Sequence, residues 1–135
     1  MNNKIKKFIS NLTKNNALSE SAFDSTIKNI NCLFPQDYLL FMKARNGGEG
    51  VINDGAFVRF WKVEELEETN ADYMTNEFAP DLFFIGSDGG GTAYGINRKT
   101  GIFVDVPFIG MSNEEATERG KDFTEFLTYL ASRQL

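Results

Sequence analysis

The chain has 135 residues, of which 41% are hydrophobic and thirteen are phenylalanine, and this suffices for one domain with its own core. It contains no histidine and a single cysteine, which excludes a Ser-His-Asp triad, a disulfide within the chain and a cysteine zinc site. The net charge of −5 argues against nucleic acid as a partner, because phosphate binding requires a cationic surface.

The beginning of the chain predicts a short amphipathic helix. Its apolar residues have the i, i+3, i+4, i+7 spacing of one helix face and are Ile5, Phe8, Ile9 and Leu12. We expect Asn15-Asn16 to end this helix. The stretch 1–9 is basic but lacks the features of a secretory signal, and no apolar run approaches the roughly 20 residues that cross a bilayer. We therefore expect a cytoplasmic protein without a membrane partner.

A second short helix is expected after this one. Ser19 or Ser21 could cap it, and its apolar residues are Phe23, Ile27 and Ile30. Cys32 follows in an apolar run, where nothing nearby would lower the pKa of its thiol. We therefore interpret Cys32 as a buried structural residue and not as a nucleophile.

The third predicted helix begins at Pro35, whose fixed φ suits a first helical turn. Asp37 lies in that turn, where a negative charge favours the positive end of the helix. The predicted buried face consists of Tyr38, Phe41 and Met42. Asn46-Gly47 should end the helix, since glycine accepts the left-handed conformation that closes it.

The first strands are predicted at Gly50–Ile52 and Ala56–Trp61, joined by a turn that contains Asp54-Gly55. Alternation along the second strand places on one face the side chains of Phe57, Arg59 and Trp61. Because Phe57 is in phase with it, we expect Trp61 in the core; an exposed Trp61 would instead be a contact anchor.

The next segment, Glu64–Tyr73, predicts a short helix, and a connecting turn is expected at Phe78–Asp81. A second hairpin combines Leu82–Gly86 with Thr92–Ile96. Ile102–Val106 forms a further strand after another tight turn. Short strands joined by tight turns predict an antiparallel meander.

The end of the chain predicts two helical segments. Ser112 and Glu115 could form a capping box for a single turn, which Gly120 would interrupt. Asp122 is the expected cap of a longer helix whose apolar stripe is Phe123, Phe126, Leu127 and Leu130. The element order predicts an α+β fold in one domain over residues 1–135, with an antiparallel β-sheet meander flanked by N-terminal and C-terminal helices.

The glycine-rich stretch Gly86–Thr92 invites two interpretations as a ligand site. A phosphate cradle would lead into a helix, whereas this stretch leads into a strand and lacks the Lys-Ser/Thr ending. A calcium site would need about 6–8 oxygen ligands, more than Ser87, Asp88 and Thr92 supply. We therefore predict a hairpin turn in which Asp88 accepts hydrogen bonds from its own loop, and we predict no metal or cofactor.

Negative charge is concentrated in the middle of the chain. No lysine or arginine occurs from Val63 to Asn97, a range with eight Asp and Glu residues. Such a block would attract a basic protein partner, although it could also be only a solvated helix face. Paired catalytic carboxylates are disfavoured, because one short helix cannot place two of them across a cleft. The candidate partner-binding residues are Glu64, Glu65, Glu67, Glu68, Asp72, Glu77 and Asp88.

Four motifs resemble, in order, those of one family. They are Phe34-Pro35-Gln36-Asp37-Tyr38-Leu39-Leu40-Phe41 with Asn46-Gly47-Gly48, Phe60-Trp61 with Glu64-Glu65-Leu66, Ile85-Gly86-Ser87-Asp88-Gly89-Gly90-Gly91 with Ala93-Tyr94-Gly95, and Phe123-Thr124-Glu125-Phe126-Leu127. Together they are similar to the SUKH superfamily, the Smi-one/Knr-four-like group. The resemblance runs from roughly Phe23 to Leu130, so the leading helix within residues 1–15 lies outside it.

This resemblance implies an α+β fold and a role in protein binding. Bacterial members are mostly immunity proteins that bind and neutralise a toxin, often a nuclease, and some eukaryotic members are regulatory scaffolds. The matching positions are turn glycines, a helix-starting proline and core aromatics, so the resemblance implies no catalytic residue. Our first hypothesis is an immunity protein that binds a cognate toxin, the second is a regulatory scaffold, and the third is a small carboxylate hydrolase, which the lack of histidine disfavours.

Overall fold

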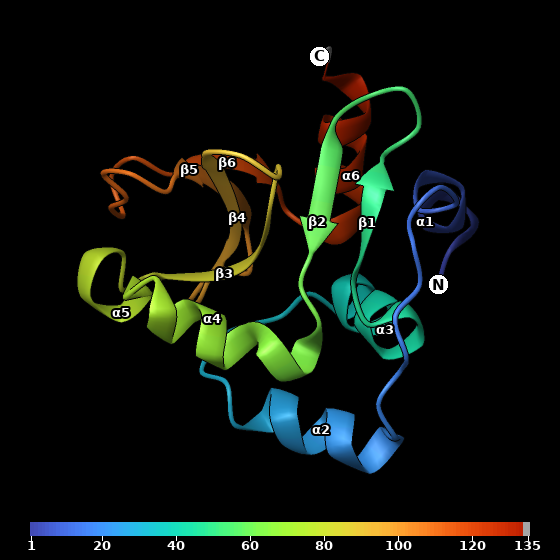
Figure 1. Ribbon diagram of the computed structural model, residues 1–135, viewed down its shortest axis with the longest axis horizontal. Helices are drawn as coiled ribbons and strands as arrows, with labels where there is room; N and C mark the ends of the chain where they lie inside the picture. The colour runs from blue at the N-terminus through green and yellow to red at the C-terminus, as the bar shows by residue number, and fades with distance from the viewer. Residues whose placement is uncertain (134–135) are drawn as a thin grey trace.

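Within residues 1–133, which the computed structural model describes, six strands form one antiparallel sheet (Figure 1). Their order in the sheet is their order in the chain, so the predicted meander is confirmed and extended. The strands are β1 (Gly48–Val51), β2 (Phe57–Phe60), β3 (Leu82–Ser87), β4 (Thr92–Asn97), β5 (Phe103–Pro107) and β6 (Thr117–Gly120).

Helices flank this sheet, as the α+β prediction requires. They are α1 (Asn3–Phe8), α2 (Glu20–Lys28), α3 (Gln36–Arg45), α4 (Leu66–Asp72), α5 (Thr75–Phe78) and α6 (Phe123–Ser132), with a 3-10 turn η1 (Val63–Glu65) before α4. Figure 1 shows α6 behind β1 and β2, while α4 and α5 run beneath β3. Between residues 1 and 133, no helix has both the length and the apolar character needed to cross a membrane.

The larger hydrophobic cluster packs the inner face of the sheet against α1, α3 and α6. At its centre, the ring of Phe123 lies 4.8 to 5.8 Å, between centroids, from those of Tyr38, Phe41, Phe60 and Phe103. These separations are in the range in which aromatic pairs attract beyond simple burial. The predicted apolar faces of the first, third and last helices are buried here, so the sequence pattern identified this core correctly.

A smaller cluster lies on the other face of the sheet. Its buried members are Ala79, Leu82, Phe84, Ala93, Val104 and Val106. The neighbours Phe83 and Phe84 therefore belong to different clusters, and every residue of β3 is buried. Side chains that are only partly buried border this second cluster, namely Trp61, Phe108, Met111 and Ala116. The two faces of the sheet are thus closed to very different degrees.

The first helix is shorter than predicted, because α1 ends at Phe8 and not at Asn15-Asn16. After it, the chain turns to run beside β1, where the Thr13 amide donates to the carbonyl of Glu49 at 3.0 Å. The Asn15 side chain donates to the carbonyl of Asn46 at 3.0 Å. Thr13 thus fastens the chain to β1, and Asn15 fastens it to the end of α3 and does not end a helix.

Strand β6 replaces the turn of helix predicted after Ser112. The Ser112 hydroxyl does accept a hydrogen bond from the Glu115 amide at 3.2 Å, but the chain then pairs with β5. The pairing is reinforced by Arg119, whose guanidinium donates to the Asp105 carboxylate at 2.9 Å. The polar sequence Thr117–Gly120 has no apolar alternation, so its pattern could not indicate a strand.

The beginning of α6 is held by two carboxylates. Asp122 caps it as predicted, accepting from the Glu125 amide at 2.8 Å. Asp37, predicted to favour its own helix, also accepts from the amides of Phe123 and Thr124 at 3.0 Å each. The N–H groups at the start of α6 that have no partner within the helix are therefore satisfied by its own cap, Asp122, and by Asp37 of α3.

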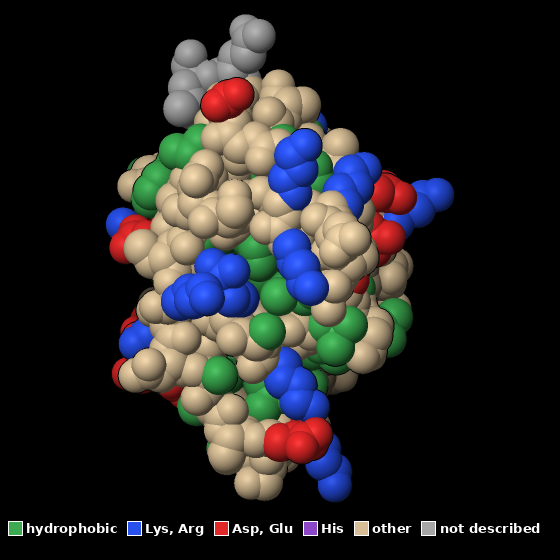
Figure 2. Space-filling view, turned by 90° about the vertical axis from the view of Figure 1, so that its right-hand side faces the viewer, with side chains coloured by type: hydrophobic (Ala, Val, Ile, Leu, Met, Phe, Trp, Pro, Cys, Tyr) green, Lys and Arg blue, Asp and Glu red, His purple; other side chains and the backbone are tan. Residues whose placement is uncertain are grey.

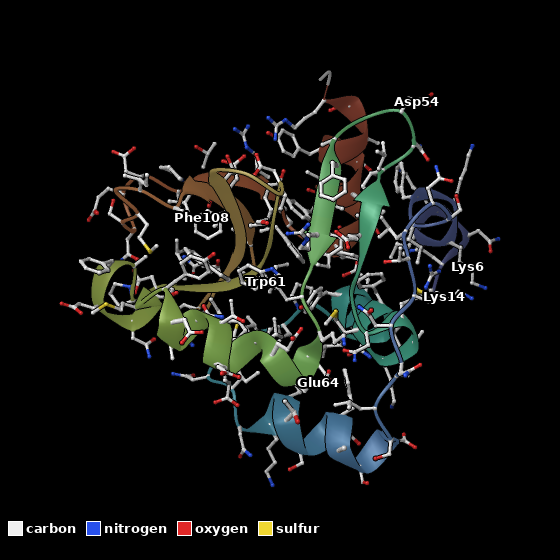
Figure 3. All side chains as sticks on the ribbon, viewed as in Figure 1. Lys6, Lys14, Asp54, Trp61, Glu64 and Phe108 are labelled. Carbon is white, nitrogen blue, oxygen red and sulfur yellow. The ribbon has the colours of Figure 1, made fainter. Side chains whose placement is uncertain are left out.

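Positive charge gathers on the side of the molecule that carries α1 and α3. Figure 2 shows this side, with Lys and Arg side chains clustered across its middle. Lys6 and Lys14 lie here, as Figure 3 shows, and both are exposed. This side is distinct from the side formed by η1, α4 and α5, which carry six of the seven candidate acidic residues, while Asp88 lies in the loop between β3 and β4.

Candidate functional site

A buried asparagine positions the start of the acidic segment. Asn46 is fully buried and itself adopts the left-handed conformation, with φ at 51°. Its Oδ1 accepts from the Val63 amide at 2.8 Å, and its Nδ2 donates to the Glu64 carboxylate at 2.8 Å. The residue expected only to end α3 therefore also fixes η1, and it engages one of the candidate acidic side chains.

A second buried asparagine fixes α4 against the sheet. The pairing of β2 with β3 is confined to Gly86 and Ser87 on the β3 side, so the backbone of Phe84 has no strand beside it there. Asn70 takes that place: its Oδ1 accepts from the Phe84 amide at 2.8 Å, and its Nδ2 donates to the Phe84 carbonyl at 2.9 Å. One side-chain amide thus closes an open sheet edge that would otherwise leave buried polar groups unpaired.

Two of the seven candidate acidic residues have structural partners. Glu64 is exposed but bonded to Asn46. Asp88 accepts from the amides of Gly90 and Thr92 at 2.8 and 3.2 Å, as its sequence position predicted. These two carboxylates stabilise local structure and are therefore less available to accept hydrogen bonds from a partner.

The other five candidates are exposed, but they do not converge on one cleft; they are Glu65, Glu67, Glu68, Asp72 and Glu77. Glu65 lines a hollow beside Lys62, and Glu67 lines another beside Arg98. Glu68 and Asp72 are four residues apart in α4 and so share one helix face. Asp72 also lines an apolar groove that no sequence pattern predicted.

That groove begins at a stack of three aromatic rings. The centroid of Tyr73 lies 6.1 Å from that of Trp61 and 4.6 Å from that of Phe108, with nearly parallel planes. Trp61 and Phe108, labelled in Figure 3, come from the chain before α4 and the chain after β5. Trp61 is half-buried, so the expectation that it belongs to the core is only partly correct. The prediction for Trp61 rested on Phe57, but Phe57 lies on the outer face of β2, whereas Val58 and Phe60 point inward.

Beyond the stack, the groove has a volume of about 430 Å³ and is lined by Asp72, Tyr73, Phe78, Phe108, Ile109, Gly110 and Met111. The exposed fractions of Tyr73, Phe78 and Ile109 are 41%, 52% and 94%. Phe78 belongs to α5, where the sequence predicted a connecting turn. Met74, 49% exposed at the start of α5, has a φ of 57°, a strained conformation for a residue with a long side chain.

The described residues contain no arrangement suited to catalysis by a cysteine or a bound metal. Burial raises the pKa of the Cys32 thiol from 9.0 to about 12, which leaves the thiol neutral and poorly nucleophilic. Within residues 1–133, no group of three or more Cys, Asp and Glu side chains is placed to hold a metal ion. What the site does offer is an apolar groove that one carboxylate, Asp72, also lines, a combination suited to binding a polypeptide.

Comparison with protein families gives one match to most of the chain. Residues 17–129 match the model described as SMI1 / KNR4 family (SUKH-1). Comparison with curated proteins gives no match. The family match includes both asparagines and the α4–α5 segment, so the elements that build the groove lie inside it.

Proposed function

Because the chain belongs to the SMI1 / KNR4 family (SUKH-1), we propose that it is a cytoplasmic immunity protein that neutralises a toxin by protein–protein contact. The toxin would carry a basic surface, as a nuclease does. The protein would act by covering the toxin's active site or a surface that the toxin needs. We assign no catalytic residue and no cofactor to this role.

The observation that carries the proposal is the exposed acidic surface of η1, α4 and α5. Five of the seven candidate carboxylates are exposed there without a hydrogen-bond partner among the described residues, and no lysine or arginine lies between Val63 and Asn97. Carboxylates that stabilise no local structure are available to a partner. A surface with an excess of negative charge also steers a basic protein and raises its association rate by about 10–10³-fold at low salt.

The test begins with the genes beside this one, where the immunity role requires a protein with a toxin domain. That domain would be produced as an inactive variant for binding measurements. The protein variant replaces three exposed carboxylates with lysine: Glu68→Lys, Asp72→Lys and Glu77→Lys. We avoid Glu64, because reversing its charge would also disturb its hydrogen bond to Asn46. We expect the association rate at low salt to fall by about tenfold or more, and its dependence on salt to become weaker.

The matched control reverses the same number of exposed carboxylates elsewhere, through Asp24→Lys, Asp54→Lys and Glu118→Lys. This variant has the same net charge, so any difference between the two isolates the position of the charges. Equal association rates for the two variants would refute the acidic surface. Absence of a complex, or a complex in which the active toxin keeps its activity, would refute the immunity role itself.

A second candidate function, a regulatory scaffold, is favoured by the basic side that carries α1 and α3. A scaffold needs two surfaces for two partners, and opposite charges on separate sides would serve this. A chain that joins two cellular proteins into one complex, with no effect on the neighbouring toxin, would support this role in place of immunity.

A further inference from the structure

The groove between α4–α5 and the loop after β5 exposes apolar side chains that nothing in the described structure covers. Tyr73, Phe78 and Ile109 project beside one another around its walls. Single exposed apolar residues are common, but contiguous ones that line a hollow mark interaction sites. The aromatic stack behind them is packed against the small buried cluster, so the groove has a rigid floor.

The charge around the groove selects among possible occupants. Both segments that form its walls lack lysine and arginine, since none occurs at 63–97 or at 100–118. Two cations lie between these segments, and both have partners. Arg98 donates to the carbonyl of Asn31 at 2.8 Å and to the side-chain oxygen of Asn76 at 3.0 Å, and Lys99 is paired with Asp81 at 3.7 Å. The exposed acidic residues of these two segments that are closest in the chain to the groove-lining residues are Glu68, Asp72, Glu77, Glu114 and Glu115.

We propose that the groove binds a basic polypeptide segment, which inserts an aliphatic or aromatic side chain between Phe78 and Ile109. Its flanking lysines or arginines would face Asp72, which lines the groove, and the exposed acidic residues that neighbour the groove in the chain. The apolar walls supply the hydrophobic contact, and the carboxylates supply orientation and selectivity. This inference rests on the proposed function and deepens it, because it names the chemistry of the toxin segment that would anchor the complex.

A second copy of this chain is a poorer occupant. A symmetric dimer across the groove would bring the Asp72 carboxylates of the two copies together, with no cation among the groove-lining residues to offset the repulsion. An acidic segment would meet the same penalty. Charge complementarity therefore favours a basic partner.

The first test needs no toxin, because three synthetic peptides serve as probes. The first has a Leu-Phe pair flanked on each side by lysines, the second replaces every lysine with glutamate, and the third keeps the lysines but replaces Leu-Phe with Ser-Ser. Binding is measured by fluorescence anisotropy at low and at physiological salt, and the contact site is mapped from amide chemical-shift changes. We expect the first peptide to bind about tenfold or more tightly than either of the others.

The site is tested with Phe78→Ser and Ile109→Ser, which alter exposed positions and should leave folding intact. The matched control is Leu40→Ser, at an apolar residue of α3 that is 40% exposed and lies away from the groove. We expect about tenfold weaker binding of the first peptide to each groove variant, and less than about a twofold change for the control. Shift changes should centre on Tyr73, Phe78 and Ile109.

The peptides would overturn the inference if the first did not bind, or if the lysine and glutamate peptides bound equally. The variants would overturn it if both groove variants bound the first peptide as the unaltered protein does. Chemical-shift changes on the α1–α3 side would also overturn it. Dimerisation that Ile109→Ser abolishes would identify a second copy as the occupant and refute the basic segment. A toxin complex that the groove variants leave intact would refute this inference alone, whereas peptide binding in the groove without any toxin complex would refute only the immunity role.

Discussion

The two faces of the sheet use the same kinds of side chain for different purposes. On the face packed against α6, Phe123 is fully buried and surrounded by other rings. On the other face, the aromatic series runs from buried Phe84 through half-buried Phe108 to Phe78, which is 52% exposed. The first face is closed by helices, while the second remains open at one end. The larger buried aromatic core therefore lies on one side of the sheet, whereas the other side leaves apolar surface exposed, where we propose that a partner binds.

The largest expected effect is the loss of stability when a buried ring is removed from the closed face, the one packed against α6. Phe123→Ala should lower the free energy of unfolding by about 3–5 kcal/mol, because it removes a ring from the centre of the core and leaves a cavity. Phe108→Ala, on the open face, should cost only about 1–2 kcal/mol, since its ring is half-exposed and mainly loses its contact with Tyr73. Denaturant unfolding of both variants measures the difference, and equal losses would contradict the division of roles.

An intermediate effect is expected at the join between α4 and the open face. Asn70→Ala leaves the buried amide and carbonyl of Phe84 without partners, which should cost about 1–3 kcal/mol. Hydrogen exchange at the Phe84 amide should accelerate more than exchange in α6. Glu68→Ala, on the same helix but exposed, is the control and should change stability by less than about 0.5 kcal/mol. Uniform acceleration across the sheet would show that Asn70 supports the whole fold and not this edge.

The smallest effect at neutral pH belongs to Cys32, which packs at the border of the closed face. Burial raises the pKa of its thiol from 9.0 to about 12, so the folded state keeps a proton that the unfolded state loses in this interval. The unfolded state then binds fewer protons, and stability must decrease as the pH rises from about 9 to about 12. Cys32→Ala should make this decrease shallower without abolishing it, because burial also raises the pKa of Tyr94 to about 12. An unchanged pH profile of unfolding would contradict the burial of the thiol.

The closed face could be predicted from the sequence because its residues follow local periodicities. The apolar stripe of α6 and the buried face of α3 are each visible within one helix. The hydrogen bonds that join α3 to α6 could not be predicted from the sequence. Asp37 and Phe123 are 86 positions apart, and nothing local to either of them indicates that one caps the helix of the other.

The open face was predicted only in part for the same physical reason. The acidic residues are close together in the sequence, so their concentration could be recognised, but their directions around α4 and α5 could not. The groove is formed by Tyr73 and Phe78 together with Ile109, and three strands separate these residues in the chain. A sequence pattern within one segment therefore cannot predict the groove. The half-buried position of Trp61 depends on Tyr73, which also requires the fold to be known.

The attachment of Asp37 to the start of α6 has a consequence for how the polypeptide folds. The helix whose phenylalanines complete the core follows all six strands in the described residues, and the carboxylate that holds its first amides belongs to a helix that precedes the strands. Until α6 docks, the inner face of the meander stays exposed to water. Because the docking contacts join residues 86 positions apart, loop closure slows this step. We therefore expect α6 to join the fold late, and the interval before it docks is when the chain is most prone to aggregate.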